Sequence, residues 1–165
     1  MIAKIIIIRT HNFSARLIHI GMWLWAVIRL LKPQLTYNHC EVGYADMTSG
    51  AIAEGVKTRK WSDYVAEHRD KYFRYIEYRL LLKPEEWNRG RYYLAKAEGT
   101  KYEYSNFIWH TVKIVIGKWI GSRTAKKLFC YEHGIRFLNA TGRYNLNPYL
   151  NPYEFKKWAD ENLRG

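Results

Sequence analysis

The residue best suited to covalent chemistry is Cys130, in the stretch Lys-Lys-Leu-Phe-Cys-Tyr-Glu-His. A cysteine attacks as the thiolate, whose pKa falls near cations and at helix N-termini. Two lysines precede Cys130, and Glu132 would lie in the first turn of a helix that began there. The alternative is an inert cysteine inside a helix that starts at Ser122. The local sequence favours this alternative, because Phe129 is a poor N-cap residue.

The second candidate is His39, at the start of a predicted strand. Strand side chains alternate, so His39 and Glu41 share one face while Cys40 lies on the other. A nucleophilic cysteine needs a base within reach, and the base needs a third group that holds its tautomer. Glu54 lies across from His39 if the following turn closes tightly at Asp46–Met47. With a turn one residue longer, Glu41 is the orienting residue, and the sequence leaves this register open.

Other chemistries have little support. The adjacent pairs His39–Cys40 and Glu132–His133 do not occur in a Cys-x-x-Cys or His-Glu-x-x-His spacing. The glycines at 117 and 121 lack the Lys-Ser/Thr of a phosphate-binding loop, and no Gly-x-Ser-x-Gly elbow occurs. We therefore expect no metal site and no cofactor.

Hydrophobic pattern, caps and turn residues predict the elements that must position these residues. They indicate one α+β domain spanning 1–165, because no linker or change of composition divides the chain. The predicted strands are 2–9, 38–45, 51–58 and 72–82, with a turn at 46–50. The predicted helices are 14–32, 61–69, 84–98, 123–140 and one that starts after an Asn151 cap. The apolar segment 105–120 is ambiguous, and a helix is the interpretation offered for it.

The composition is globular but unusually basic. Lysine and arginine number 27 against 15 aspartates and glutamates, a net charge of +12, and the chain has seven Trp, 14 Tyr and six Phe. Basic and aromatic residues together are typical of proteins that bind nucleic acid or another anionic partner. Two cysteines do not make a disulfide framework, which fits a reducing compartment.

The longest apolar stretch is 17–31. It is shorter than the roughly 20 residues of a membrane-spanning helix, and His19 and Arg29 interrupt it. Burial in the core is the expected role, and contact with a membrane surface or a partner is the alternative. Because no signal peptide is recognised, we expect a cytoplasmic protein, with peripheral membrane contact through 17–31 as a variant of that expectation.

The order of these motifs carries a family resemblance. The sequence runs from a strand and an apolar helix to Asn-His-Cys-Glu-Val at 38–42, Ala-Glu-Gly-Val at 53–56, Gly-Thr-Lys-Tyr-Glu-Tyr at 99–104, Phe-Cys-Tyr-Glu at 129–132 and the tail 148–155. This series resembles the circularly permuted papain-like cysteine hydrolases of the NlpC type, the branch that includes lecithin:retinol acyltransferase-like enzymes. The resemblance covers nearly the whole chain and rests on the order and spacing of short motifs.

The resemblance implies a permuted papain-like fold, in which a small antiparallel sheet packs against helices. It implies Cys130 as nucleophile, His39 as base and a polar third residue on the next strand, here Glu54, and it reverses the local interpretation of Cys130. Tyr131 departs from the family pattern, which has a small residue there. The implied reaction is cleavage or transfer of an amide or ester, on a cell-wall peptide or a lipid acyl group. The competing hypothesis is an inactive basic module that binds nucleic acid or an anionic membrane.

Overall fold

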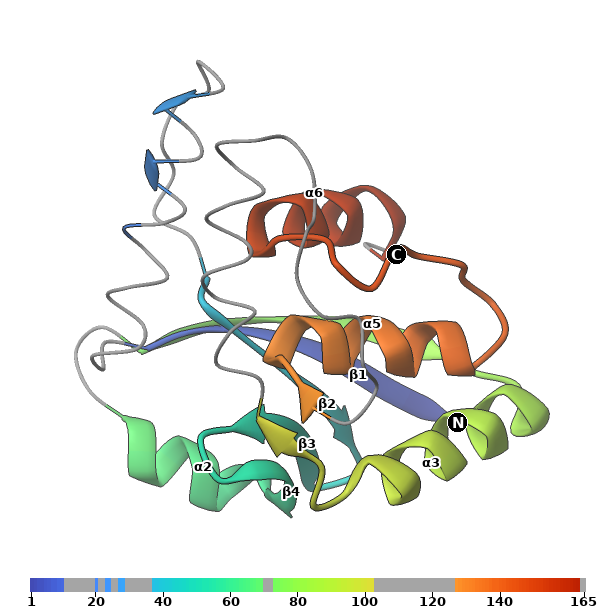
Figure 1. The fold of residues 1–165 in the computed structure, drawn as a ribbon. Helices are drawn as coiled ribbons and strands as arrows, with labels where there is room; N and C mark the ends of the chain where they lie inside the picture. The colour runs from blue at the N-terminus through green and yellow to red at the C-terminus, as the bar shows by residue number, and fades with distance from the viewer. Residues whose placement is uncertain are drawn as a thin grey trace.

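The computed structural model of the protein describes residues 1–10, 37–69, 73–102 and 127–163, together with Ile20, Trp23, Leu24, Val27 and Ile28. Within this part of the chain the fold is α+β (Figure 1). A five-stranded sheet has the order β4-β3-β2-β1-β5, and every neighbouring pair is antiparallel. Its strands are β1 (Ile2–Arg9), β2 (His39–Tyr44), β3 (Met47–Ile52), β4 (Gly55–Lys60) and β5 (Arg74–Leu81).

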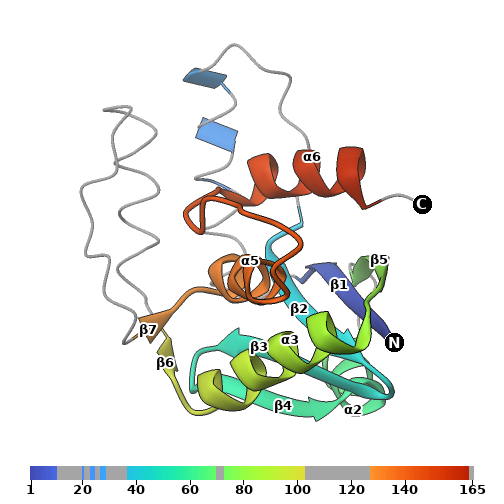
Figure 2. The ribbon, with the colours of Figure 1, turned by 90° about the vertical axis from the view of Figure 1, so that its right-hand side faces the viewer.

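Four helices and a short strand pair complete the described fold. The helices are α2 (Trp61–His68), α3 (Pro84–Ala97), α5 (Cys130–Ala140) and α6 (Pro152–Asn162). The strands β6 (Lys101–Tyr102) and β7 (Lys127–Leu128) pair in parallel, and Figure 2 shows them beside the start of α5.

The run of four isoleucines in β1 is buried on both of its faces. Ile5 and Ile7 belong to the large core cluster under α5, whereas Ile6 and Ile8 pack with Tyr64 of α2 and with Phe73. Successive side chains of a strand point to opposite faces of the sheet, so a continuous run of apolar residues indicates a strand that is covered on both faces. The expected buried strand at 2–9 is therefore confirmed, and β1 is a central strand of the sheet.

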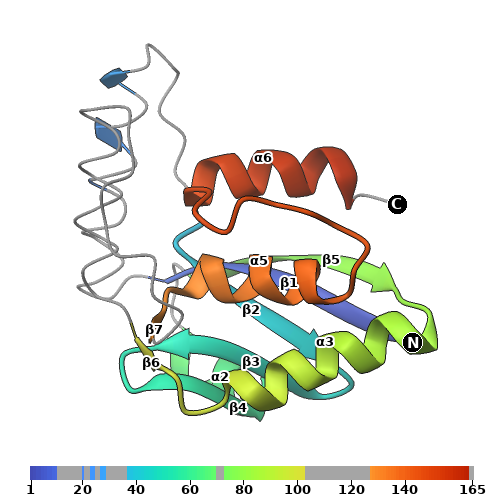
Figure 3. The same cartoon turned by 45° about the vertical axis from the view of Figure 1, so that its right-hand side comes forward.

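The elements are stacked in layers. Figure 3 shows α5 lying between the sheet and α6, with α3 beside α5. The approach of α3 to α5 depends on Gly90, where a Cβ would overlap the ring of Phe137. Phe155, Ala159 and Leu163 of the α6 region join the same core, so this layer is held by apolar contact. Burial of this kind contributes about 25 cal/mol for each Å² of apolar surface.

Several predicted elements are confirmed. The strand expected at 72–82 and the helices expected at 61–69 and 84–98 correspond to β5, α2 and α3. The last helix starts as its caps indicate, because the Asn151 side chain accepts from the Glu154 amide and the Glu154 side chain accepts from the Asn151 amide. This reciprocal capping box satisfies two amides that no helical carbonyl reaches.

The expected hairpin is a three-stranded meander. The turn that we predicted at 46–50 is a two-residue turn at Ala45–Asp46, where Ala45 has a φ of 48°. The strand predicted at 51–58 is interrupted by a second turn, so that Ile52 pairs with Gly55, which has a φ of 113°. Alanine rarely adopts the left-handed conformation, so its sequence gives no signal for so tight a turn.

The helix predicted at 123–140 starts later, at Cys130. Phe129 has extended backbone angles (φ −97°, ψ 154°), and Leu128 pairs with Tyr102 as part of β7. Strand pairing therefore fixes the chain just before the helix and places Cys130 in its first turn. Residues 123–126 lie outside the described part of the chain.

The two apolar segments are mostly outside the described residues. This applies to 105–120 in full and to most of the helix predicted at 14–32. The five described residues of the second segment are helical, and each is at least 40% exposed. Core burial, the role expected for 17–31, is therefore wrong for these five side chains.

Candidate active site

The site begins with two side chains on one face of β2. His39 and Glu41 are two residues apart, and His39 Nε2 lies 2.6 Å from Glu41 Oε1. Their cross-strand neighbours are Ile8 and Ile6, on the α2 face of the sheet. The predicted sharing of one face by His39 and Glu41 is confirmed, because the strand is regular from residue 39 onward.

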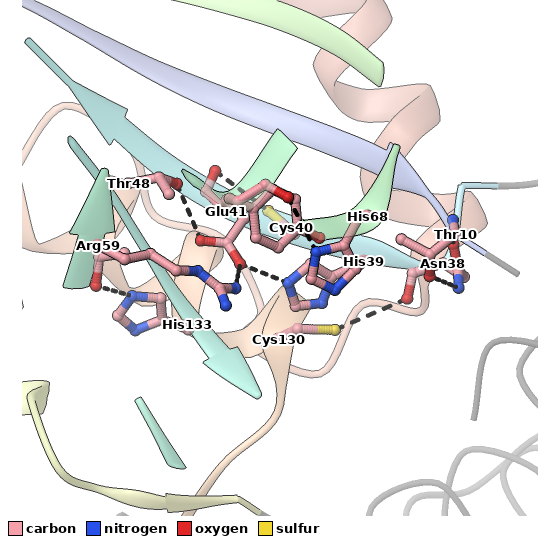
Figure 4. Close-up of polar contacts among 12 residues, drawn as sticks. Thr10, Asn38, His39, Cys40, Glu41, Thr48, Arg59, His68, Cys130 and His133 are labelled. Atoms are coloured by element: carbon pink, nitrogen blue, oxygen red, sulfur yellow. Dashed lines mark hydrogen bonds and ion pairs between the residues drawn. The ribbon is translucent and has the colours of Figure 1, made fainter. Parts of the chain in front are cut away.

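Cys130 reaches this pair from the start of α5. Figure 4 shows its sulfur next to the ring of His39, and the thiol donates to the Asn38 carbonyl at 3.9 Å. Because Nε2 of His39 faces Glu41, Nδ1 is the ring nitrogen left for Cys130. The structure thus brings together two of the predicted residues, His39 and Cys130, that are far apart in the sequence.

The Glu41 carboxylate is held from three sides. Besides His39, the Thr48 hydroxyl donates to Oε2 at 2.9 Å and the Arg59 guanidinium donates to Oε1 at 3.1 Å. Glu41 is fully buried, and Arg59 lies 4.2 Å from the centre of the Tyr64 ring. A buried carboxylate is stable only when it is paired and hydrogen-bonded, and these contacts supply both conditions.

The charges of the site reinforce one another. Burial lowers the pKa of His39, but hydrogen bonds to Cys130 and Glu41 and the charges of both outweigh burial and raise this pKa to about 10. Burial raises the pKa of Glu41, but His39, Arg59 and Thr48 together hold this pKa below its ordinary value. At neutral pH, His39 is therefore an imidazolium that faces an ionised carboxylate.

Glu54 does not lie across from His39. It occupies the turn between β3 and β4, is mostly exposed, and its carboxylate lies 4.0 Å from the Lys57 ammonium. The turn at Ala45–Asp46 sets the register so that β3 ends at Ile52, two residues before Glu54. This register corrects the prediction that Glu54 contacts His39, and Glu41, the alternative, is the carboxylate that does so.

Two residues of the site have no counterpart in the sequence predictions. Arg59 pairs with Glu41, and the Tyr64 ring stacks between Arg59 and the ring of His68. Tyr64 is almost completely buried, and desolvation raises the pKa of its hydroxyl. The pairing of β4 with β3 places Arg59 opposite Thr48. The sequence could have indicated this position only if β3 and β4 had been predicted as two strands with a turn between them.

A second histidine connects α5 to the sheet. His133 is one turn after Cys130, and its Nε2 lies 3.2 Å from the Ser49 hydroxyl while its Nδ1 lies 3.1 Å from the Tyr93 hydroxyl. Burial lowers the pKa of His133 to about 4, so this ring is neutral at neutral pH. These two contacts join α5 to β3 and to α3, one turn along the helix from Cys130.

The other cysteine and the bulky residue after Cys130 belong to the core. Cys40 lies against Gly134 of α5, where a Cβ would overlap its sulfur, and burial raises the pKa of its thiol. Tyr131 is fully buried, packs edge-on against Phe155 and donates to the Tyr37 carbonyl at 2.8 Å. The tyrosine that departs from the family pattern is therefore accommodated between α5 and α6.

No group of three or more His, Cys, Asp or Glu side chains in the described ranges is arranged to hold a metal ion. The chemistry that the site offers comes from its own thiol, imidazole and carboxylate. In comparisons with known proteins, no family model matches the sequence, and no curated protein matches it.

Proposed function

We propose that the protein is a thiol hydrolase or acyltransferase that acts on an amide or ester. The observation that carries the proposal is the row Cys130, His39 and Glu41, in which the imidazole lies between a thiol and a buried carboxylate. This is the arrangement that activates a cysteine nucleophile. The substrate classes that fit the resemblance are a cell-wall peptide and a lipid acyl group.

The proposed reaction has two steps. It starts from the pair in which the Cys130 proton has moved to His39. The Cys130 thiolate bonds to the carbonyl carbon, and the carbonyl oxygen becomes an oxyanion near the Cys130 amide. Amides in the first turn of a helix point at such a charge. The bond to the leaving nitrogen or oxygen then breaks as His39 protonates that atom. Water or an acceptor hydroxyl then bonds to the thioester carbon and gives its proton to His39, and the carbon–sulfur bond breaks, which restores the thiolate beside the imidazolium.

We further propose that the fold is the circularly permuted papain-like one. Two features support this assignment: the strand with the base precedes the helix with the nucleophile, and Cys130 is the first residue of that helix. The third residue departs from the expected position, because Glu41 is on the same strand as His39 and not on the next one.

The two cysteines provide a matched test. We would incubate the full chain with p-nitrophenyl acetate and p-nitrophenyl octanoate, follow nitrophenol release, and locate the acyl group by mass spectrometry. We expect the wild type and Cys40→Ala to be acylated on Cys130, and Cys130→Ala to release nitrophenol at the rate of buffer. Equal turnover by wild type and Cys130→Ala would show that Cys130 is not the nucleophile.

A further inference from the structure

One helical face outside the site is apolar and exposed. Ile20, Trp23, Leu24, Val27 and Ile28, here called the apolar stripe, are helical, and each is between 40% and 57% exposed. Their spacing of three, one, three and one residues places them on a single side of a helix. Soluble proteins rarely expose so many large apolar side chains next to one another unless a surface covers them.

The charge of the surrounding sequence indicates which surface that is. Residues 11–36 contain Arg16, Arg29 and Lys32 and no aspartate or glutamate. A helix with Trp and aliphatic residues on one face, in a segment that carries only positive charge, is the pattern of helices that lie in the interface of an anionic bilayer. Association of two copies through the same face would bring together chains with a charge of +12 each, which is unfavourable.

The stripe is too short to cross a bilayer, and no helix in the described part of the chain is long and apolar enough to do so. An exposed row of apolar side chains that does not cross a bilayer can lie in its interface with the headgroups. We propose that the apolar stripe docks the protein on an anionic lipid bilayer, with its five side chains in the interface between headgroups and acyl chains.

Thr10 and Asn38, the residues on either side of this segment, lie next to the candidate active site. The Thr10 amide donates to Asn38 Oδ1 at 2.8 Å, and Asn38 Nδ2 donates to the Thr10 hydroxyl at 3.0 Å, so both ends of the segment meet at one buried point. The Asn38 carbonyl also accepts a hydrogen bond from the Cys130 thiol, and Asn38 directly precedes His39 in the sequence. Ile20 is ten positions after Thr10, and Asn38 is ten positions after Ile28, so the stripe is close to the candidate site in sequence.

Vesicle sedimentation tests the docking without reference to catalysis. We would spin the full chain with vesicles of phosphatidylcholine and phosphatidylglycerol in equal parts, and with phosphatidylcholine alone, at low and high salt. The stripe variant is Trp23→Glu with Leu24→Glu. The matched control is Tyr92→Glu, which changes an aromatic residue of α3 that is 71% exposed. Far-ultraviolet circular dichroism checks that each variant is folded.

We expect wild type and Tyr92→Glu to sediment with the anionic vesicles, and the stripe variant to bind at least about tenfold more weakly. Binding to phosphatidylcholine alone should be weaker for every protein. Equal binding by wild type and the stripe variant, or no binding by wild type, would overturn the proposal. A wild type that dimerises while the stripe variant is monomeric would assign the stripe to a second copy instead. Loss of docking with Cys130 still acylated, or the reverse, separates this proposal from the proposed function.

Discussion

Gly50 lies directly opposite Glu41 in the pairing of β2 with β3, and a Cβ at position 50 would overlap the Glu41 carboxylate. The absence of a side chain on β3 therefore creates the space in which the carboxylate lies flat against the sheet. In this arrangement its oxygens reach His39, Thr48 and Arg59.

Gly50→Ala should displace the Glu41 carboxylate from His39. We expect a loss of about 1–3 kcal/mol in the free energy of unfolding, because overpacking forces side chains from their positions. The rate of Cys130 alkylation by iodoacetamide should fall together with stability. Gly43→Ala is the matched control on β2, because the atoms nearest to its Cβ would be side-chain atoms of Ile6 and Lys4 and not the Glu41 carboxylate. Normal alkylation in Gly50→Ala would refute this prediction.

Glu41→Gln should remove the charge that contacts His39 and should leave Arg59 with Glu67, whose carboxylate is 4.0 Å away, as its ion-pair partner. We expect turnover of a p-nitrophenyl ester to fall by roughly 10²–10⁴-fold, the contribution of a positioned acid–base group. Stability should fall by about 3 kcal/mol, because one partner of a buried pair is lost. Glu54→Gln is the comparison, and it should match the wild type in both measurements. Equal effects of the two changes would contradict this prediction and would support Glu54 as a residue that acts on His39.

The pairing of His39 should make stability sensitive to alkaline pH. Its pKa is about 10 in the folded protein against an ordinary value of 6.5. A raised pKa stabilises the fold fully below pH 6.5, and this stabilisation is lost as pH rises through about 10. Urea unfolding of wild type and His39→Gln should therefore show a difference that shrinks between pH 6.5 and 10. A constant difference across that window would contradict the imidazolium assignment.

His133 should have the opposite effect, at acid pH. The pKa of His133 is about 4 in the folded protein against an ordinary value of 6.5. Between these two pH values the unfolded chain therefore binds a proton that the folded protein does not. Stability should fall over this window, by roughly 3 kcal/mol in total. His133→Gln removes this contribution, so wild type and variant should become more similar in unfolding free energy as the pH is lowered. Parallel pH profiles would show that His133 is not buried in the neutral form.

Elements with local signals were predictable from the sequence. The β-branched run of β1 and the Asn-Pro-x-Glu start of α6 depend on neighbours within four residues, and both are confirmed. The start of α5 at Cys130 depends on the pairing of Leu128 with Tyr102, which are 26 positions apart. No local rule contains that pairing, and the cap rule applied to Phe129 gave the wrong boundary.

The candidate site shows the same division. The common face of His39 and Glu41 follows from the alternation of one strand. The choice of Glu41 over Glu54 follows from a two-residue turn in which Ala45 adopts a positive φ, and alanine does not signal that conformation. Arg59 requires the register of a third strand, which sequence alternation leaves undetermined.

The placement of the site on β2 and α5 also sets the order in which it is made. The five strands of the sheet are complete at Leu81, and the imidazole at position 39 is synthesised 91 residues before the thiol at position 130. A growing chain can therefore bring His39, Glu41 and Arg59 together before Cys130 has been synthesised. The nascent chain lacks this thiol until α5 leaves the ribosome and docks on the sheet, so the proposed site is completed late in synthesis, with α6 still to follow.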